Sequence, residues 1–544
     1  MQSASFRLNE NIIFVLLLTL FIGTRFIGIG SQSLWLDEIN LARIASELSF
    51  TGNILDDISR LFQLVKIEPH PPLYFVLSKV WTSIFGYSLI SLRTLSIFWI
   101  VLLFILLGIW ARKEFGARFA WLLLLLLTFS HALLVESQNF RPYTFNMLMG
   151  GAIGIAYLHF LKDTRQRRRL PPLCLWILIA SLSHYASVIF AFAIAGHHFL
   201  SGVYNQPKNS GRWFFNSVII MLATLPALIW YGASFQDLYQ RQLGDLSKSR
   251  DFLDAISVFR TFTGFPGLIP ILFLPLIAGS DGVVQNARNI WARLSVDPVF
   301  VTCTGLGALF YVLIIAASFA QPSILQNKNF LTAFPVVLIA FTRYVLVFAD
   351  DVRIFRQAIV LAAIGFITFL VTGYPLEKNS YYQPRREQVR EAAALVRKSA
   401  MPGDIVLFGT VSMNGYALQP TKTYLGLIEG RPEVLDGVEA INFPPQTTYI
   451  VDQQSTDIAR RQAILSEAID KLKHNPSRRL FIDLPHEQML SRAEIELLVK
   501  SGFCVQVTQY QQESMMIVEN LAASATCVAW APALKYFPRG KSPI

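Results

Sequence analysis

Long segments of this chain contain no Asp, Glu, Lys or Arg, and this feature constrains the fold most. Residues 187–203, 213–235, 264–280, 299–320 and 358–375 are among them. Each is close to or above the roughly 17–25 residues that a membrane-spanning helix needs. Over the whole chain 53% of residues are hydrophobic and 15% are charged, against about 25% charged residues in a soluble domain. The sequence therefore predicts a mainly α, polytopic membrane protein.

The basic loops set the expected topology. ARKEFGAR (111–118) and KDTRQRRR (162–169) are the densest of them, and cytoplasmic loops of membrane proteins are enriched in Lys and Arg. Counting outward from these two loops gives about eleven transmembrane helices, the first of which is retained and not cleaved as a signal peptide. The expected spans are 11–30, 88–110, 117–135, 142–161, 170–186, 187–203, 213–235, 264–280, 299–320, 331–349 and 357–375.

The same count places residues 31–87 outside the cell membrane, together with everything after residue 375. The run HPPLYFVLSKVWTSIFG (70–86) within the first external segment has about 16 residues and contains a Lys. Such a run is short for a span and predicts an interfacial or half-inserted helix. Residues 1–375 are thus expected to form the transmembrane module.

Residues 376–544 have a different pattern, typical of a small α/β domain on the extracytoplasmic side. Apolar runs rich in β-branched residues predict strands, and amphipathic stretches between them predict helices. GDIVLFG (403–409) matches neither a P-loop nor a dinucleotide-binding glycine turn. The expected strands are 403–410, 447–452, 478–484, 503–510 and 514–519, and the expected helices are 385–399, 455–473 and 487–501.

The net charge of +11 and the four cysteines say little about ligands. Basic cytoplasmic loops explain the charge, and no RNA-binding or zinc-knuckle pattern is present, so we expect no nucleic-acid partner. No two cysteines form a CxxC motif, which gives no indication of a metal or redox site.

An acidic pair, Asp37 and Glu38, follows the first expected span in SLWLDEINLARIA (33–45). A carboxylate at the mouth of a membrane cavity can serve as a general base or as a metal ligand. The simpler interpretation, favoured by spacing alone, is that Asp37 caps a helix that begins at residue 38.

Several cations and one histidine lie at other external positions. His70 in EPHPPLYF (68–75) could donate to a phosphate or bind a metal, and Arg141 and Lys328 each precede an expected helix. Arg25 and Arg93 lie inside expected spans, where charged residues usually face a polar cavity. The simpler interpretations are an interfacial histidine and cations that snorkel to the membrane surface.

These motifs together resemble those of a known family. SLWLDE, HPPLYF, SQNFRPY and the NKNF-to-helix junction are similar to motifs of the bacterial protein O-mannosyltransferase-like glycosyltransferases (glycosyltransferase family 39). The chain more distantly resembles the lipid A aminoarabinose transferases. Both groups are GT-C glycosyltransferases, and the resemblance covers roughly residues 10–350.

The resemblance implies a GT-C fold, a polyprenyl-phosphate sugar donor, inversion at the anomeric carbon and an acidic base in the first external loop. It makes Asp37 the expected base with Glu38 beside it. The family's glutamate is replaced by Asn139, and its late Arg-Tyr pair appears as Lys328-Asn329, which keeps the charge but not the bidentate geometry. Donor phosphate is expected at Arg141, Lys328, His70, Arg93 and Arg25, and substrate at Tyr143, Gln138, Trp35 and Tyr74.

The sequence thus predicts a hexosyl- or pentosyltransferase of a bacterial inner membrane, with its active site facing the periplasm or exterior. Its expected partners are the lipid-linked donor, membrane lipids and a lipid, glycan or protein acceptor. No cofactor is certain, and the enzymatic alternative is a divalent metal ion bound by Asp37, Glu38 or His70. The non-enzymatic alternatives are a lipid-linked sugar flippase, which usually shows repeated halves, and an inactive membrane scaffold.

Overall fold

The computed structural model describes residues 2–242, 268–277, 282–348, 356–364, 389–443, 454–485, 494–498 and 503–520, with short gaps inside several of these ranges. The chain forms two compact units. The helical unit comprises Met1–Ile29, Leu48–Trp81 and Arg93–Tyr381. The α/β unit comprises Gly30–Glu47, Thr82–Leu92 and Tyr382–Ile544, so it includes parts of segment 31–87.

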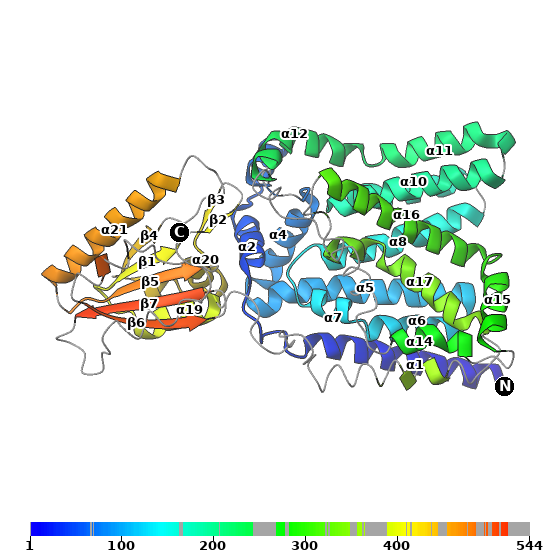
Figure 1. The fold of residues 1–544 in the computed structure, drawn as a ribbon, viewed down its shortest axis with the longest axis horizontal. Helices are drawn as coiled ribbons and strands as arrows, with labels where there is room; N and C mark the ends of the chain where they lie inside the picture. Colours follow the sequence, from blue (N-terminus) through cyan, green and yellow to red (C-terminus); the bar gives the residue numbers. More distant parts are fainter. Residues whose placement is uncertain are drawn as a thin grey trace. The chain divides into compact units, whose positions relative to one another are not determined.

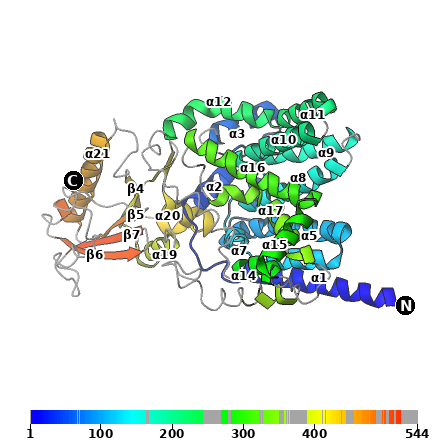
Figure 2. The same cartoon turned by 45° about the vertical axis from the view of Figure 1, so that its right-hand side comes forward.

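Long, roughly parallel helices make up the helical unit (Figures 1 and 2). Each of the first ten expected spans contains a described helix, whereas most of the eleventh, 357–375, lies outside the described residues. The helices are α1 (Gln2–Phe26), α3 (Ile54–Val65), α4 (Leu73–Phe85), α5 (Leu89–Phe115), α6 (Ala117–Thr128), α7 (His131–Ser137), α8 (Tyr143–Lys162), α9 (Leu170–Ser181), α10 (Tyr185–Asn205), α11 (Ser210–Leu222), α12 (Leu225–Gln242), α14 (Leu268–Ile277), α15 (Val283–Leu294), α16 (Pro298–Ala320) and α17 (Phe334–Val345), with the 3₁₀ helix η5 (Asn327–Thr332) before α17.

The apolar character of these helices confirms a multi-pass membrane protein. Among the described residues, four helices are long and apolar enough to cross a bilayer: Leu89–Phe115, Tyr143–Lys162, Tyr185–Tyr204 and Pro298–Phe319. Helices α11 and α12 make a fifth candidate, bent by 49° at a short break. Four further helices are apolar but shorter, and α4 is one of them, as the 70–86 run predicts.

Close packing against α8 fixes the segment that precedes α17. A Cβ added at Gly150 would lie 1.8 Å from the carbonyl oxygen of Thr332, so η5 approaches the backbone of α8 directly. Only glycine permits such an approach of one backbone to another. One turn further along, a Cβ added at Gly154 would lie 2.6 Å from the Val336 side chain. Lys328 lies on η5 and is therefore held at a defined position beside the start of α8.

The α/β unit contains a five-stranded sheet in the order β4-β1-β5-β7-β6. The first three of these strands are parallel, and β7 runs antiparallel to both β5 and β6. The predicted small α/β domain is therefore present. The strands are β1 (Ile405–Gly409), β4 (Glu439–Phe443), β5 (Leu480–Pro485), β6 (Phe503–Tyr510) and β7 (Glu513–Asn520), with a separate hairpin of β2 (Val411–Met413) and β3 (Tyr416–Leu418).

Strand β1 is buried on both faces because helices cover both sides of the sheet. Ile405 and Leu407 pack with Leu465, Ile469 and Leu472 of α21 (Gln454–His474), whose spacing places the three on one face of the helix. Helices α19 (Val389–Ser399) and α20 (Pro420–Thr423) cover the other face (Figure 1). Expected strand 447–452 and most of expected helix 487–501 lie outside the described residues.

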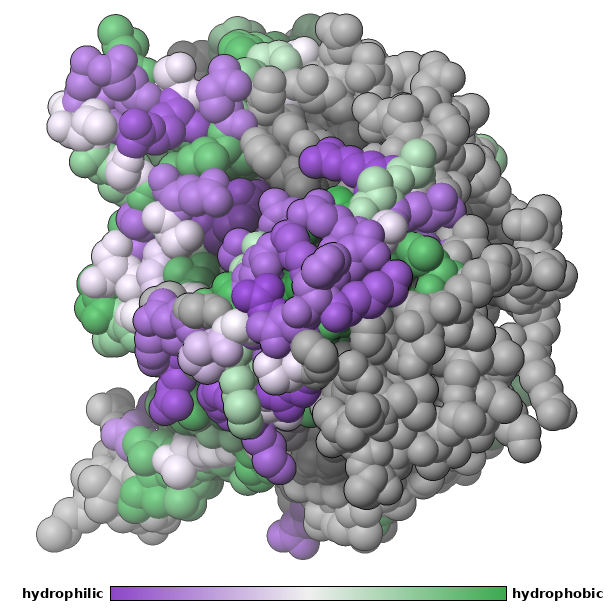
Figure 3. Space-filling model, turned by 90° about the vertical axis from the view of Figure 1, so that its left-hand side faces the viewer, coloured by the Kyte–Doolittle hydropathy of each residue, from purple (hydrophilic) through white to green (hydrophobic). Residues whose placement is uncertain are grey.

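The described surface of the α/β unit seen in Figure 3 is largely hydrophilic. Helix α2 (Leu36–Glu47) belongs to this unit and packs against α20. Eight of the twelve α2 residues are buried, and they include Glu38 and Asn40. This unit thus combines a hydrophilic surface with an apolar core of its own, as a domain that folds by itself does.

Candidate anion site and catalytic carboxylates

Four segments that each precede a helix meet in the helical unit. His70 precedes α4, Arg141 precedes α8, His184 precedes α10, and Lys328 lies on η5 before α17. The N-terminus of a helix carries a partial positive charge and unsatisfied amide groups, so it favours anions. Leu73 N–H donates to the Leu182 carbonyl over 3.0 Å and thereby ties the start of α4 to the α9–α10 turn.

The aromatic rings at these helix starts stack on one another. The His70 and His184 rings are stacked with centroids 4.4 Å apart, and Tyr185 lies 4.5 Å from His184 and 5.7 Å from His70. Tyr143 meets His184 edge to face at 5.8 Å. We call the group of His70, Arg141, Tyr143, His184, Tyr185, Lys328 and Asn329 the anion cluster.

Both cations belong to this group. The Arg141 Nη2 atom lies 3.3 Å from His70 Nε2, and Arg141 is only 5% exposed. A snorkelling arginine keeps its guanidinium in water, so burial here contradicts that interpretation. Lys328 Nζ lies 5.4 Å from the centre of the Tyr143 ring, and the neighbouring Asn329 accepts a 2.9 Å hydrogen bond from the Tyr185 hydroxyl.

Hydrogen bonds fix the tautomer of each histidine. The Ala186 amide donates to His184 Nδ1 over 3.1 Å, so the His184 proton sits on Nε2. An arginine can only donate, so His70 Nε2 accepts from Arg141 and the His70 proton sits on Nδ1. Each ring therefore carries one N–H group whose position is determined by its neighbours.

Three buried polar atoms of the cluster lack a hydrogen-bond partner within the described part of the chain. They are His70 Nδ1, His184 Nε2 and the Tyr143 hydroxyl. Leaving a buried polar group unsatisfied costs about 1–3 kcal/mol, so each of them indicates a missing ligand or water. All three can donate, and two cations lie among them. The cluster is thus suited to an anion with several acceptor oxygens, such as a phosphate.

Burial and neighbouring charge keep both histidines neutral. Burial lowers the pKa of His70 well below its usual value, and His184, Arg141 and Lys328 lower it further. The pKa of His184 is lowered well below its usual value by burial and by the charges of Lys328 and Arg141. A bound anion would offset these charges and raise both pKa values.

This arrangement predicts a loss of stability in acid. Below pH 6.5 the unfolded chain binds protons at both histidines while the folded protein does not, so the free energy of unfolding falls as the pH falls. At pH 5.5 the loss is up to about 1.4 kcal/mol for each histidine. Thermal unfolding in nanodiscs at pH 7.5 and 5.5 measures it, and polyprenyl phosphate should reduce the loss.

Two variants make this pH test specific. Replacing His70 and His184 together by Gln should remove the part of the pH dependence that these two residues cause, whereas replacing His159 by Gln should leave it. His159 lies in the last turn of α8 and pairs with Glu114. An unchanged pH dependence in the double variant would show that other groups cause the loss.

The remaining cations predicted to bind phosphate have other partners. Arg25 is buried and donates to the carbonyls of Leu127 and Thr128, at 2.9 and 2.8 Å, where α6 ends. A cation at a helix C-terminus is stabilising there. Arg93 is buried and donates to the Ile29 carbonyl over 2.8 Å. We therefore leave both outside the anion cluster.

Gln138 and Tyr74, which the sequence predicts to bind substrate, also contact other parts of the protein. The Gln138 amide donates to the carbonyls of Arg25 and Ile27, both at 2.7 Å, where α1 ends. Tyr74 lies buried on α4 with its ring 6.2 Å from Phe145. At Asn139, where the family has a glutamate, the side chain donates to Glu136 over 2.7 Å, so a carboxylate is present one turn earlier.

The adjacent carboxylates Asp37 and Glu38 have different surroundings in the α/β unit. Glu38 is fully buried, and its carboxylate accepts a 3.2 Å hydrogen bond from the Trp35 amide at the start of α2. A glutamate at the third helical position commonly closes a capping box in this manner. Asp37 lies in the same first turn and is half-buried. Helix α2 begins at Leu36, so Asp37 is not the residue that precedes it.

The residues proposed for a metal do not suit one. The described part of the chain contains no group of three or more His, Cys, Asp or Glu that could hold a metal ion. His70 has two cationic neighbours, which disfavour a further cation. The Glu38 carboxylate is directed to the Trp35 amide. We derive no catalytic step through a metal.

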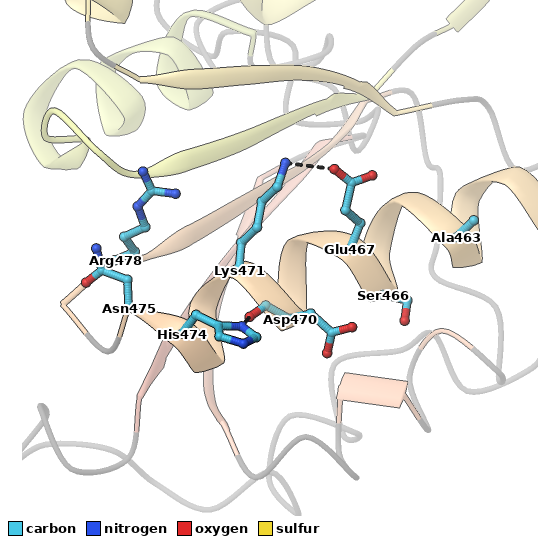
Figure 4. A pocket seen from close by; sticks show the side chains of 8 residues that line it. All are labelled: Ala463, Ser466, Glu467, Asp470, Lys471, His474, Asn475 and Arg478. Carbon is cyan, nitrogen blue, oxygen red and sulfur yellow. Dashed lines mark hydrogen bonds and ion pairs between the residues drawn. The ribbon is translucent and has the colours of Figure 1, made fainter.

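A hollow lies on α21 of the α/β unit (Figure 4). Lys471 on its floor pairs with Glu467 at 2.7 Å and with Glu439 of β4 at 2.5 Å. These groups are a third or more exposed, and such surface pairs contribute little. The hollow has charges of both signs that already neutralise each other, so we assign it no catalytic role.

Part of the chain matches a known protein family. Residues 69–230 match the family described as dolichyl-phosphate-mannose-protein mannosyltransferase. The matched range contains every member of the cluster except Lys328 and Asn329. No curated protein sequence matches the chain.

Among solved structures, the chain is similar to ArnT from Cupriavidus metallidurans. The apo structure superimposes with a TM-score of 0.53 at 11% identity, and the structure bound to undecaprenyl phosphate with 0.54 at 12% identity. Both cover 92% of this chain and 97% of ArnT. The likeness confirms the predicted GT-C fold, and with the family match it confirms the predicted resemblance to the protein mannosyltransferases and aminoarabinose transferases.

Proposed function

We propose that this protein is a glycosyltransferase that moves a sugar from a polyprenyl-phosphate carrier to a lipid, glycan or protein acceptor, with inversion at the anomeric carbon. The ArnT fold, the match to a mannosyltransferase family and the apolar helices support this class of reaction. The sugar is a hexose or a pentose, and the reaction takes place on the outer face of a bacterial cytoplasmic membrane.

One observation carries the proposal: the anion cluster presents buried donors beside two cations. His70 Nδ1–H, His184 Nε2–H and the Tyr143 hydroxyl lack protein acceptors within the described residues. Four helix starts add partial positive charge around them. A phosphate linked to a polyprenyl chain would place its oxygens among these donors and its chain along the apolar helices.

The proposed chemistry is a direct displacement. The acceptor hydroxyl oxygen attacks the anomeric carbon, the bond from that carbon to the phosphate oxygen breaks, and polyprenyl phosphate leaves. Asp37 accepts the hydroxyl proton, and Arg141 and Lys328 stabilise the charge that develops on the leaving phosphate. Preorganised donors of this kind act most strongly on charge that appears in the transition state.

The two adjacent carboxylates then have separate roles. Glu38 holds the first turn of α2 through the Trp35 amide, and Asp37 on that turn acts as the base. Trp35 is half-buried next to this turn, where an acceptor sugar ring could stack on its indole. The assignment of Trp35 to the acceptor follows from its position next to the proposed base.

Mass spectrometry of the host's glycolipids and glycoproteins, with and without this protein, tests the function. We expect one sugar to disappear from one class of acceptor, and the polyprenyl-phosphate sugar to accumulate. A complete and unchanged set of glycans would contradict a transferase. Loss of a sugar without any accumulated donor would instead indicate a role in supplying the donor.

A further inference from the structure

The loop between α1 and α2 contacts the C-terminal part of the α/β unit. Segment Gly30–Glu47 belongs to the same compact unit as residues 382–544, although more than 300 residues of chain separate them. Arg390, near the start of α19, makes the contact. Its Nη1 donates to the Gly30 carbonyl over 2.6 Å and its Nη2 to the Ser31 carbonyl over 3.1 Å.

A second bond strengthens this contact through the backbone. The Arg390 amide donates to the Ser33 hydroxyl over 3.1 Å. This amide lies in the first turn of α19, where helical amides lack a partner within the helix. Ser33 thus satisfies the amide as a capping residue normally does, but from a distant part of the chain. The Ser33 hydroxyl itself donates to the Leu34 carbonyl over 3.2 Å.

Glu391 orients the arginine. The Nε and Nη2 atoms of Arg390 both donate to one oxygen of Glu391, at 3.0 and 2.7 Å. The planar guanidinium is thereby fixed with its remaining donors directed at the loop carbonyls. Lysine has no such fork and could satisfy only part of this set.

The residues that Arg390 contacts lie only a few positions before the acidic pair, Asp37 and Glu38. Ser33 and Leu34 are buried, Trp35 follows, and α2 begins at Leu36. The amides of Glu38 and Ile39 both donate to the Trp35 carbonyl, at 2.9 and 3.0 Å, so the first turn of α2 is continuous with the fastened loop. Helix α2 also packs against α20 of the same unit. The orientation of Asp37 therefore depends on residues of the C-terminal domain.

We propose that the C-terminal α/β domain serves the reaction by holding the loop and first turn of α2, and with them Asp37, through Arg390 and Ser33. Arg390 is a positioning residue in this account, and the inference rests on the proposed role of Asp37 as the base. A displacement of a catalytic group by about 1 Å can lower a rate about 100-fold. Contacts that hold Asp37 in position would therefore affect the rate of sugar transfer.

The test compares Arg390→Ala, Arg390→Lys and Ser33→Ala with Arg397→Ala in full-length protein in nanodiscs. Arg397 lies on the same helix and pairs with Glu429 at 2.8 Å on the surface. Arg390→Ala should lower the transfer rate at least tenfold with the Kd for polyprenyl phosphate unchanged, because the anion cluster is untouched. Arg390→Lys should recover part of the rate, Ser33→Ala should show a smaller loss, and Arg397→Ala should behave as the wild type.

Hydrogen exchange supplies a readout that does not require turnover. The amides of residues 33–40 should exchange faster in Arg390→Ala than in Arg397→Ala. If Arg390→Ala fails to fold, Arg390→Lys and Ser33→Ala give the same comparison. Wild-type rates and exchange in the Arg390 and Ser33 variants would overturn the inference. An active Asp37→Asn variant would instead reject the base, so the two failures are distinguishable.

Discussion

Replacing Asp37 by Asn should abolish sugar transfer and leave the binding of polyprenyl phosphate unchanged. Asparagine has nearly the same shape but cannot accept the proton of the attacking hydroxyl. General-base catalysis is worth about 10²- to 10⁴-fold, so turnover should fall by at least a factor of about 100. The measurement is single-turnover transfer by purified protein, with Kd for polyprenyl phosphate determined in parallel.

Glu38→Gln is the matched control for this prediction. Glutamine keeps a side-chain oxygen that can accept a hydrogen bond from the Trp35 amide. Like glutamate, it can close a capping box at the third position of a helix. We expect this variant to lose far less activity per folded molecule than Asp37→Asn. If Asp37→Asn retained more than about a tenth of wild-type turnover, or if Glu38→Gln were the inactive variant, the base would have to be reassigned.

Replacing Arg141 by Ala should lower the catalytic rate more than it weakens donor binding. Its guanidinium is buried beside His70, and negative charge on the leaving phosphate grows toward the transition state. Loss of one such donor typically costs about 10²- to 10³-fold in rate. Steady-state kinetics with varied donor concentration separate kcat from KM.

Arg141→Lys and Arg25→Lys complete the comparison. Lysine at position 141 keeps the charge but not the planar fork, so we expect partial rescue. Arg25→Lys should lower the melting temperature but leave turnover per folded molecule unchanged, because Arg25 caps the end of α6. Full activity in Arg141→Ala would remove Arg141 from the site.

The sequence is informative about the membrane fold because long apolar helices have a strong and local signal. Basic loops then give the order of the spans, and the charge-free runs locate α10 and α16 closely. Shorter elements are less evident. Strand β4 (Glu439–Phe443) has the sequence EAINF, which is only five residues long and does not alternate regularly between polar and apolar residues, and the sequence gives no expectation of a strand there.

The site is predicted in part. Arg141, Lys328, His70 and Tyr143 all belong to the anion cluster, and each lies at or near the start of an expected helix. His184 and Tyr185 are absent from the prediction because they fall within the apolar segment 170–186, which adjoins the apolar segment 187–203. A histidine-tyrosine pair at the outer turn between two spans is the signal that could have identified them.

Arg25 and Gln138 lie outside the anion cluster, and the reason is physical. Both have polar groups near the outer ends of spans, which is also where helix ends expose backbone carbonyls. A buried cation or amide there can serve the backbone and not a ligand. Sequence position does not distinguish these roles, whereas the bonds to Leu127, Thr128 and Ile27 do.

The most direct test of the account is the release of polyprenyl phosphate by purified protein in nanodiscs. The protein receives a polyprenyl-phosphate sugar and an acceptor extract prepared from host membranes. We expect wild-type protein to release polyprenyl phosphate and glycosylate an acceptor, and Asp37→Asn and Arg141→Ala to do so at least about 100-fold more slowly. Movement of an intact donor across the bilayer, with no release by the wild type, would contradict a transferase and identify a flippase.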